Sequence, residues 1–213
     1  GSTDQAVSSR MLRHIETLIG TFRDAVGPDV DINLDLNFNY KPESAMRIAK
    51  VLEQFDLLWL EIDMYDPEAM LQIKESTTTK ICTGENLYTR YGFRELVENQ
   101  GADILSPDLA KAGGLLEGRR IADLADLYYI PIAPHNICGP VGTYAAAHVC
   151  AAIPNFLALE FHHLDNDVWS GLVEEGPQLI EGGHITVGDG PGLGLTLIDD
   201  NLRAGVREDL GFL

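Results

Sequence analysis

Basic residues are scarce in this sequence, which carries 15 Lys and Arg against 33 Asp and Glu, a formal net charge of −18 at pH 7. This charge repels a phosphate backbone, and no local cluster of Lys and Arg offers an exception. We therefore predict that nucleic acid is not a partner. Most of the carboxylates are typical of a solvated surface, so only those at the ends of predicted strands carry weight below.

Cysteine is also rare. Cys82, Cys138 and Cys150 are odd in number and show no CxxC spacing, which argues against a disulfide framework or a cysteine-based zinc site. They indicate reduced, buried thiols in a cytoplasmic protein. The sequence contains no apolar run typical of a secretory signal or a membrane-spanning helix, so we predict no membrane partner.

What the sequence does contain is an alternation of two apolar patterns. Some stretches repeat apolar residues at helical spacing, and others are short apolar runs of strand length. The helical stretches are 15–22, 45–52 and 121–128. The predicted strands are 30–36, 57–61, 80–83, 103–105, 130–133 and 156–159.

This alternation predicts an α/β fold with parallel strands joined by helical crossovers. It leaves two architectures open, a doubly wound open sheet and a closed barrel of eight strands. A barrel requires about two strands before the first predicted one, because barrels of this class usually have eight. The chain opens on a predicted helix instead, so we expect a barrel whose first strands are absent from this chain.

After Glu160 the pattern changes to a stretch rich in Gly and Asp. We therefore divide the chain into a partial barrel (1–163) and a tail (164–213) that packs on the barrel or against a further domain. The run Gly190-Pro191-Gly192-Leu193-Gly194 lacks the GxGxxG spacing and a following helix, which favours a turn over a nucleotide-binding loop.

Each predicted strand ends in, or shortly before, a group that can bind a metal ion or move a proton. A single acidic residue in such a place is more often a helix cap or a solvated loop residue. In a parallel barrel, however, the C-terminal ends of the strands meet at one mouth, where the active site lies. We expect six side chains to face this mouth: Asp35, Glu61, Glu85, Asp108, His135 and Glu160.

The first three of these groups predict a metal site. Converging carboxylates at Asp35, Glu61 and Glu85 would repel one another unless a hard dication such as Mg²⁺ lay between them. Asp108 and His135 follow on the next two strands, where a carboxylate can hold an imidazole in one tautomer and make it a general base. The remaining histidines lack this context and are predicted to be structural: His14, His148, His162, His163 and His184.

Taken in order, these local motifs resemble the mandelate racemase subgroup of the enolase superfamily, over residues 31–194. The motifs are Asp35-Leu36-Asn37, Trp59-Leu60-Glu61, Gly84-Glu85-Asn86, Pro107 to Gly114, Ala133-Pro134-His135-Asn136, Leu159-Glu160 and the closing run 190–194. The resemblance implies a TIM-type (β/α)7β barrel, modified as in enolases, with the first strands and the N-terminal capping domain absent from this chain.

The resemblance also assigns roles to the residues at the barrel mouth. It implies Mg²⁺ as cofactor, with Asp35, Glu61 and Glu85 as its ligands, and a catalytic dyad of Asp108 and His135. Glu160 would be the acid that hydrogen-bonds the substrate carboxylate or enolate.

The sequence departs from the family pattern at two places. Asn37 stands where some acid-sugar dehydratases have a histidine that acts as general acid, so we predict a substrate-binding role for it. Glu61 is followed by Ile62 and Asp63 instead of the more usual Glu-Pro, which alters the loop and keeps the ligand.

The function implied is a lyase, a dehydratase that removes the proton alpha to the carboxylate of a sugar acid. An enediolate forms, the β-hydroxyl leaves, and a 2-keto-3-deoxy acid results. Two alternatives stay open: a racemase or epimerase of a 2-hydroxy acid, and a non-catalytic metal-binding protein on the same fold. The expected partners are a small carboxylate substrate and further copies of the same chain in a homo-oligomer.

Overall fold

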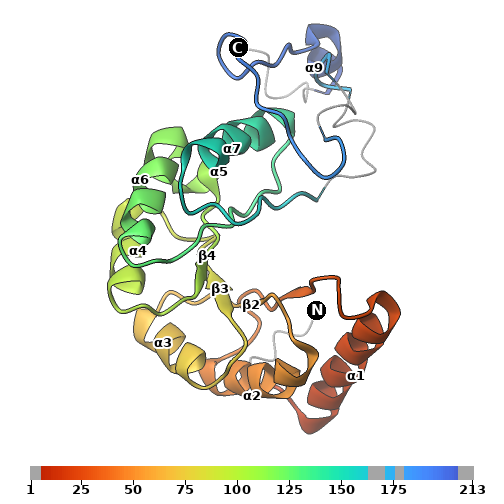
Figure 1. Ribbon diagram of the computed structural model, residues 1–213, viewed down its shortest axis with the longest axis vertical. Coiled ribbons are helices and arrows are strands. Elements are labelled where there is room, and N and C mark those ends of the chain that lie inside the picture. Colours follow the sequence, from red (N-terminus) through yellow and green to blue (C-terminus); the bar gives the residue numbers. More distant parts are fainter. Residues whose placement is uncertain (1–5, 163–170, 176–179, 206–213) are drawn as a thin grey trace.

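The computed structural model describes residues 6–162, 171–175 and 180–205, in which helices and strands alternate along a crescent (Figure 1). The strands are β1 (Asn33–Asp35), β2 (Trp59–Glu61), β3 (Ile81–Thr83) and β4 (Ile104–Leu105). The helices are α1 (Ser9–Val26), α2 (Pro42–Leu52), the 3-10 turn η1 (Glu53–Phe55), α3 (Pro67–Glu75), α4 (Thr89–Glu98), α5 (Leu109–Ala112), α6 (Gly114–Asp126), α7 (Pro140–Ala152) and α9 (Asp199–Gly205).

The strands form one parallel sheet in the order β1-β2-β3-β4, so the predicted α/β fold with a parallel sheet is confirmed. The predicted strands 130–133 and 156–159 continue the sheet only as single parallel bridges, from Leu105 to Ile132 and from Ile132 to Phe156. Prolines explain the difference, because Pro131 and Pro134 on either side of Ile132 have no N–H to donate to a ladder.

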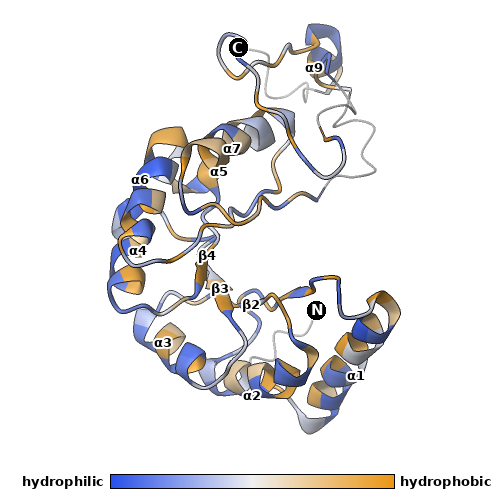
Figure 2. Cartoon of the chain, in the orientation of Figure 1, coloured by the Kyte–Doolittle hydropathy of each residue, from blue (hydrophilic) through white to orange (hydrophobic). Residues whose placement is uncertain are grey.

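The helices lie on the outer, convex side of the crescent and the strands on its inner side (Figure 1). The apolar face predicted for α2 is confirmed, since Ala45, Ile48, Ala49 and Leu52 are all fully buried. Figure 2 shows β3 and β4 as apolar, as expected of strands covered by helices.

The apolar face predicted for α1 is only partly buried. Ile19 lies in the core, whereas Leu18 and Phe22 are 40% and 47% exposed. The position of α1 explains this, because it lies at one end of the crescent, next to α2 (Figure 1). None of the described helices is both long and apolar enough to cross a membrane.

Local sequence signals fix where the helices begin. The Asp66 carboxylate accepts hydrogen bonds from the N–H groups of Glu68 and Ala69, and Pro67 takes the first helical position of α3. In the same way, the Ser8 side chain accepts from the Met11 N–H at the start of α1. A capping side chain satisfies N–H groups that have no partner within the helix, and proline suits the first turn because it has no N–H to satisfy.

The described part of the tail packs against α7. Tyr144 and Val173 are buried together in a small apolar cluster. The Tyr144 hydroxyl donates to the Thr186 carbonyl oxygen (2.5 Å), and His148 Nε2 lies 2.9 Å from the Leu193 carbonyl oxygen. His148 therefore holds the tail, which agrees with its predicted structural role.

The predicted turn in the tail is confirmed, because the Gly194 N–H donates to the Pro191 carbonyl oxygen at 3.1 Å. Gly192 and Gly194 both adopt positive φ angles, which glycine tolerates best. The predicted tail boundary at 163/164 lies outside the described residues.

Candidate active site

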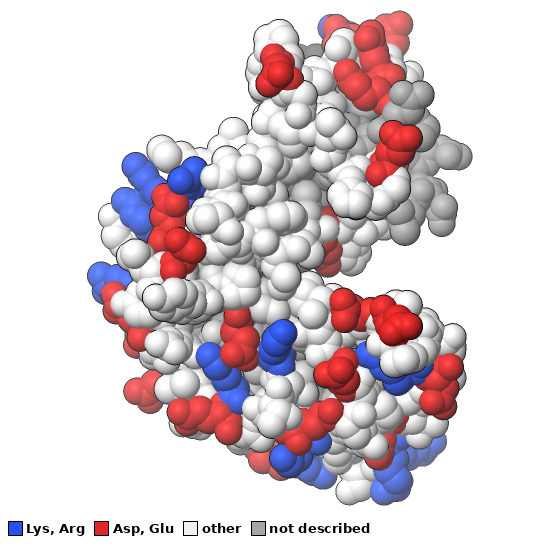
Figure 3. Space-filling view, in the orientation of Figure 1, with Lys and Arg blue, Asp and Glu red and all other residues white. Residues whose placement is uncertain are grey.

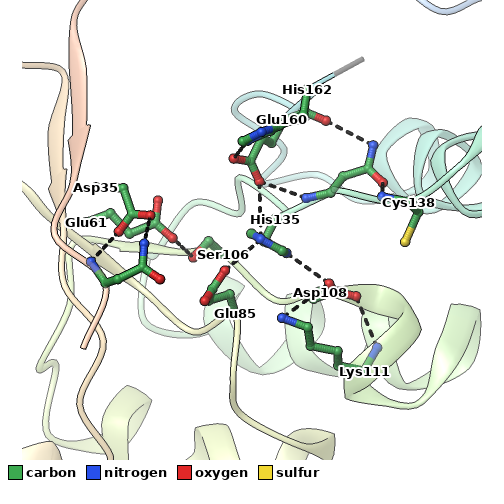
Figure 4. A network of polar contacts seen from close by, with 12 residues as sticks. Asp35, Glu61, Glu85, Ser106, Asp108, Lys111, His135, Cys138, Glu160 and His162 are labelled. Atoms are coloured by element: carbon green, nitrogen blue, oxygen red, sulfur yellow. Dashed lines mark hydrogen bonds and ion pairs between the residues drawn. The ribbon is translucent and has the colours of Figure 1, made fainter. Parts of the chain in front are cut away.

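All six side chains predicted to face one mouth lie at the C-terminal ends of the strands and bridged segments (Figure 4). Direct contacts join four of them, Glu85, Asp108, His135 and Glu160, into one polar network. Asp35 and Glu61 are the last residues of β1 and β2, and Glu85 and Asp108 follow β3 and β4. His135 and Glu160 follow the two bridged segments. Parallel strands bring residues far apart in the sequence to the same edge in this way.

His135 occupies the centre of the network. Its Nδ1 lies 2.9 Å from Asp108 Oδ2, its Nε2 lies 2.6 Å from Glu85 Oε2, and its side chain is 9% exposed. Burial by itself lowers the pKa of His135, but the hydrogen bond with Asp108 and the charges of Glu160 and Glu85 outweigh burial, so the pKa is raised. The ring is therefore a stronger base than a free imidazole.

The two carboxylate oxygens of Asp108 make different contacts. Its Oδ1 caps α5 by accepting the N–H groups of Ala110 (2.9 Å) and Lys111 (3.1 Å), while its Oδ2 meets His135. Burial raises the pKa of Asp108, and the hydrogen bonds from His135 and Lys111 more than offset this, so the pKa is lowered. The contact with His135, with the cap as a smaller contribution, thus favours the ionised form of Asp108. The cap also holds the carboxylate in place, which fixes the orientation of the imidazole.

The three carboxylates predicted as metal ligands each contact a neighbouring polar group. Asp35 accepts the Asn37 N–H (2.6 Å) and its side-chain amide, and Glu61 Oε1 accepts the Ser106 hydroxyl (3.1 Å). Glu85 meets His135. In these orientations, no three His, Cys, Asp or Glu side chains of the described residues are arranged to hold a metal ion.

The electrostatics of this region nevertheless fit a hard dication. Burial, followed by the charges of Asp35 and Asp63, raises the pKa of Glu61 to about 8. Burial and the charge of Glu85 raise the pKa of Asp63 to about 7. Asp63 is 3% exposed, and its Oδ2 has no hydrogen-bond partner. Buried carboxylates with uncompensated charge are the ligand type that Mg²⁺ prefers, so the donor set suits this ion.

Asp63 was not predicted as part of the site. Its position two residues after Glu61 was an available signal, because residues i and i+2 of an extended segment share a face. In the sequence it stands out only as a departure from the family pattern.

His162 was predicted to be structural, yet the structure places it in the network. Its Nε2 lies 2.5 Å from Glu160 Oε1, while Glu160 Oε2 accepts the Asn136 N–H at 2.8 Å. His184 instead contacts the Gly182 carbonyl oxygen and His14 is exposed on α1, outside this network, whereas His163 lies outside the described residues. Proximity to Glu160 was the only signal in the sequence for His162.

Gly84 positions the backbone at Glu85. Its φ is +133°, and a Cβ there would lie 2.8 Å from Phe93 Cε1, inside the core. We expect Gly84→Ala to lower the free energy of unfolding by about 1–3 kcal/mol, because the left-handed backbone and the contact with Phe93 are both unfavourable. Urea unfolding would measure the change. Gly114→Ala is the control, because Gly114 also has a positive φ but no atom lies within 4 Å of a Cβ added there. Equal losses in the two variants would exclude the contact as a cause.

Comparisons with known proteins identify the family of this chain. The profile of the family described as enolase C-terminal domain-like matches residues 7–201. A relative named D-xylonate dehydratase, from Haloferax volcanii, is 46% identical over 198 residues, which cover 92% of this chain and 48% of the relative. The chain thus spans about half the length of the curated relatives that it matches.

Solved structures share the fold of this chain. A mandelate racemase/muconate lactonizing enzyme-like protein from Rubrobacter xylanophilus is 43% identical, with a TM-score of 0.92 over 97% of this chain and 53% of that chain. A protein named as an L-alanine-DL-glutamate epimerase, from Burkholderia xenovorans and bound to magnesium and fumarate, is 29% identical, with a TM-score of 0.84 over 95% of this chain and 50% of that one. The predicted family is thereby confirmed, and the chain belongs to the enolase superfamily as a C-terminal domain of its mandelate racemase-like branch.

Proposed function

We propose that this chain is the catalytic part of a Mg²⁺-dependent acid-sugar dehydratase. The observation that carries the proposal is His135, which is held by Asp108 on one nitrogen and directed at Glu85 and Glu160 with the other. In this proposal residues 1–163 form part of a (β/α)7β barrel and 164–213 a tail that packs on it.

Asp35, Glu61 and Glu85 would hold the Mg²⁺ ion. When bound, the ion stabilises the negative charge that develops on the substrate carboxylate. The raised pKa values of Asp35 and Glu61 support this assignment, because burial and then the charges of neighbouring carboxylates disfavour their ionised forms, and a bound cation would offset both effects.

His135 removes the proton alpha to the carboxylate, and Asp108 keeps the ring in place and stabilises its charged form. Glu160 hydrogen-bonds the carboxylate or enolate of the substrate. The side-chain oxygen of Asn37 binds a substrate hydroxyl, since its amide nitrogen donates to Asp35. Loss of the β-hydroxyl and tautomerisation then give a 2-keto-3-deoxy acid.

The dehydratase is favoured by the relative with 46% identity, which is named for dehydration of D-xylonate. A second candidate is a racemase or epimerase, which shares the first proton transfer and is supported by the similarity to the solved structure that carries an epimerase name. The two differ in the step after proton removal. A dehydratase expels the β-hydroxyl, whereas a racemase returns a proton to the opposite face of the alpha carbon.

A screen of the whole protein with Mg²⁺ and a panel of sugar acids, D-xylonate among them, tests the proposal. We expect 2-keto acid to form from at least one sugar acid and to require Mg²⁺. In D₂O, alpha-proton exchange without keto acid would establish the racemase or epimerase instead. Neither exchange nor keto acid with any member of the panel would leave the non-catalytic metal-binding protein as the explanation.

A further inference from the structure

The dehydratase reaction needs an acid for the departing hydroxyl, because hydroxide is a poor leaving group. Asn37 cannot supply the proton, since an amide does not titrate in the ordinary pH range and this one donates to Asp35. Lys111 lies on the side of Asp108 away from Glu160 (Figure 4), 3.7 Å from Asp108 Oδ2. Neither residue is therefore placed to supply the proton, whereas other groups of the network are.

A second imidazole stands at the mouth, beside Glu160. The Glu160 carboxylate lies between two histidine rings (Figure 4). Its Oε1 is 2.5 Å from His162 Nε2, and its Oε2 is 3.9 Å from His135 Nε2. The N–H of Asn136 fixes Oε2 at 2.8 Å, so the backbone holds the carboxylate in this position.

The two rings differ in their surroundings. The His135 side chain is 9% exposed, whereas that of His162 is 53% exposed and that of Glu160 is 35% exposed. The space-filling view shows a recess on the inner side of the crescent, with an acidic group beside it (Figure 3). His162 can therefore exchange protons with water, and Glu160 is accessible to a substrate. A short contact between a carboxylate and an imidazole suits a pair that shares one proton.

We propose that Glu160 and His162 act together as the acid that protonates the leaving β-hydroxyl. His135 removes the alpha proton, and Glu160 delivers a proton that His162 supplies from solvent. His162 is thus a positioning and proton-supplying residue that acts through Glu160. This assignment rests on the proposed dehydratase function.

Atoms and electrons balance in this step. His135 accepts the alpha proton, and the electron pair of that C–H bond moves onto the substrate carboxylate, which becomes an enediolate. When the β-hydroxyl leaves, this electron pair returns to form the double bond between the alpha and beta carbons. The bond from the beta carbon to oxygen breaks, its electron pair goes to oxygen, and the proton of the Glu160–His162 pair joins that oxygen to release water. The pair then regains a proton from solvent, and His135 loses one.

The His162→Gln variant tests the proposal in the whole protein. Glutamine retains a hydrogen-bond donor for Glu160 but cannot supply a proton. With the sugar acid that the wild type converts, we expect keto-acid formation to fall about 10²-fold or more, while alpha-proton exchange in D₂O persists within about threefold of wild type. A 3-deoxy-3-fluoro analogue should restore elimination, because fluoride leaves without protonation. The exposed His184→Gln is the matched control, with both rates unchanged.

Three results with the variant would overturn the proposal. Exchange and elimination could fall together, which would mean that His162 only supports the site. Both could stay at the wild-type level, or the fluoro analogue could fail to restore elimination. If the wild type itself exchanges the alpha proton and makes no keto acid, the dehydratase assignment fails and this proposal with it. That result is seen before any variant is made.

Discussion

The His135→Ala variant is expected to lose both alpha-proton exchange and keto-acid formation, by about 10²–10⁴-fold. His135 is the base in the first step, so every later step depends on it. The effect differs from that expected of His162→Gln, which separates elimination from exchange. Exchange is measured in D₂O by NMR, and keto acid by a colorimetric assay on the same samples.

Two observations accompany this prediction as controls. Mg²⁺ should still raise the melting temperature of His135→Ala, because Asp35 and Glu61 are unchanged. His14→Ala, on the exposed side of α1, should retain full activity. An alanine variant of His135 that still exchanges the alpha proton at the wild-type rate would show that another group is the base.

The Glu61→Gln variant is expected to lose the stabilising effect of Mg²⁺ and to gain stability in its absence. Glu61 is a proposed ligand, so its neutral isostere weakens the site. Without the ion, its charge lies half-buried near Asp35 and Asp63, and glutamine removes that repulsion. Relative to wild type, the melting temperature of the variant should be lower in Mg²⁺ and higher in EDTA. Glu43→Gln, on the exposed side of α2, is the matched control and should show neither.

The same variant has a characteristic pH dependence. The pKa of Glu61 in the folded state, about 8, lies above its ordinary value of 4.5. Its contribution to stability is therefore complete below about pH 4.5 and is lost as the pH rises through about 8. Asp63, with a pKa raised to about 7, adds a loss in the same direction. Metal-free wild type should thus lose stability over this range, and Glu61→Gln should lose less. Equal slopes in the two proteins would contradict the placement of Glu61.

The site residues that the sequence could predict lie at strand ends or in the loops just after them. Asp35, Glu61 and Asp108 follow apolar runs whose parallel pairing the alternation of helix and strand requires, so their convergence follows from topology. The apolar face of α2 was also predictable, because its apolar residues recur with the helical period.

Other residues depend on neighbours that are distant in the sequence. The charge environment of Asp63 comes from Glu85 and Asp35, on other strands. Leu18 and Phe22 follow the helical period, but their exposure depends on the elements beside α1. The predicted strand at Ile132 is not a regular strand in the structure, because prolines on both sides limit its pairing to single bridges.

The sequence by itself determined the parallel α/β fold, the family and the six side chains at the strand ends, because the periods of helix and strand and the order of the motifs are properties of the chain alone. The tertiary structure decided the partners of those side chains. In the folded structure, Asp108 contacts His135 and also caps α5, and His162 contacts Glu160. Asp63 is buried, and its Oδ2 has no hydrogen-bond partner. Such contacts depend on distances and burial, which arise only when the strands and loops are packed together.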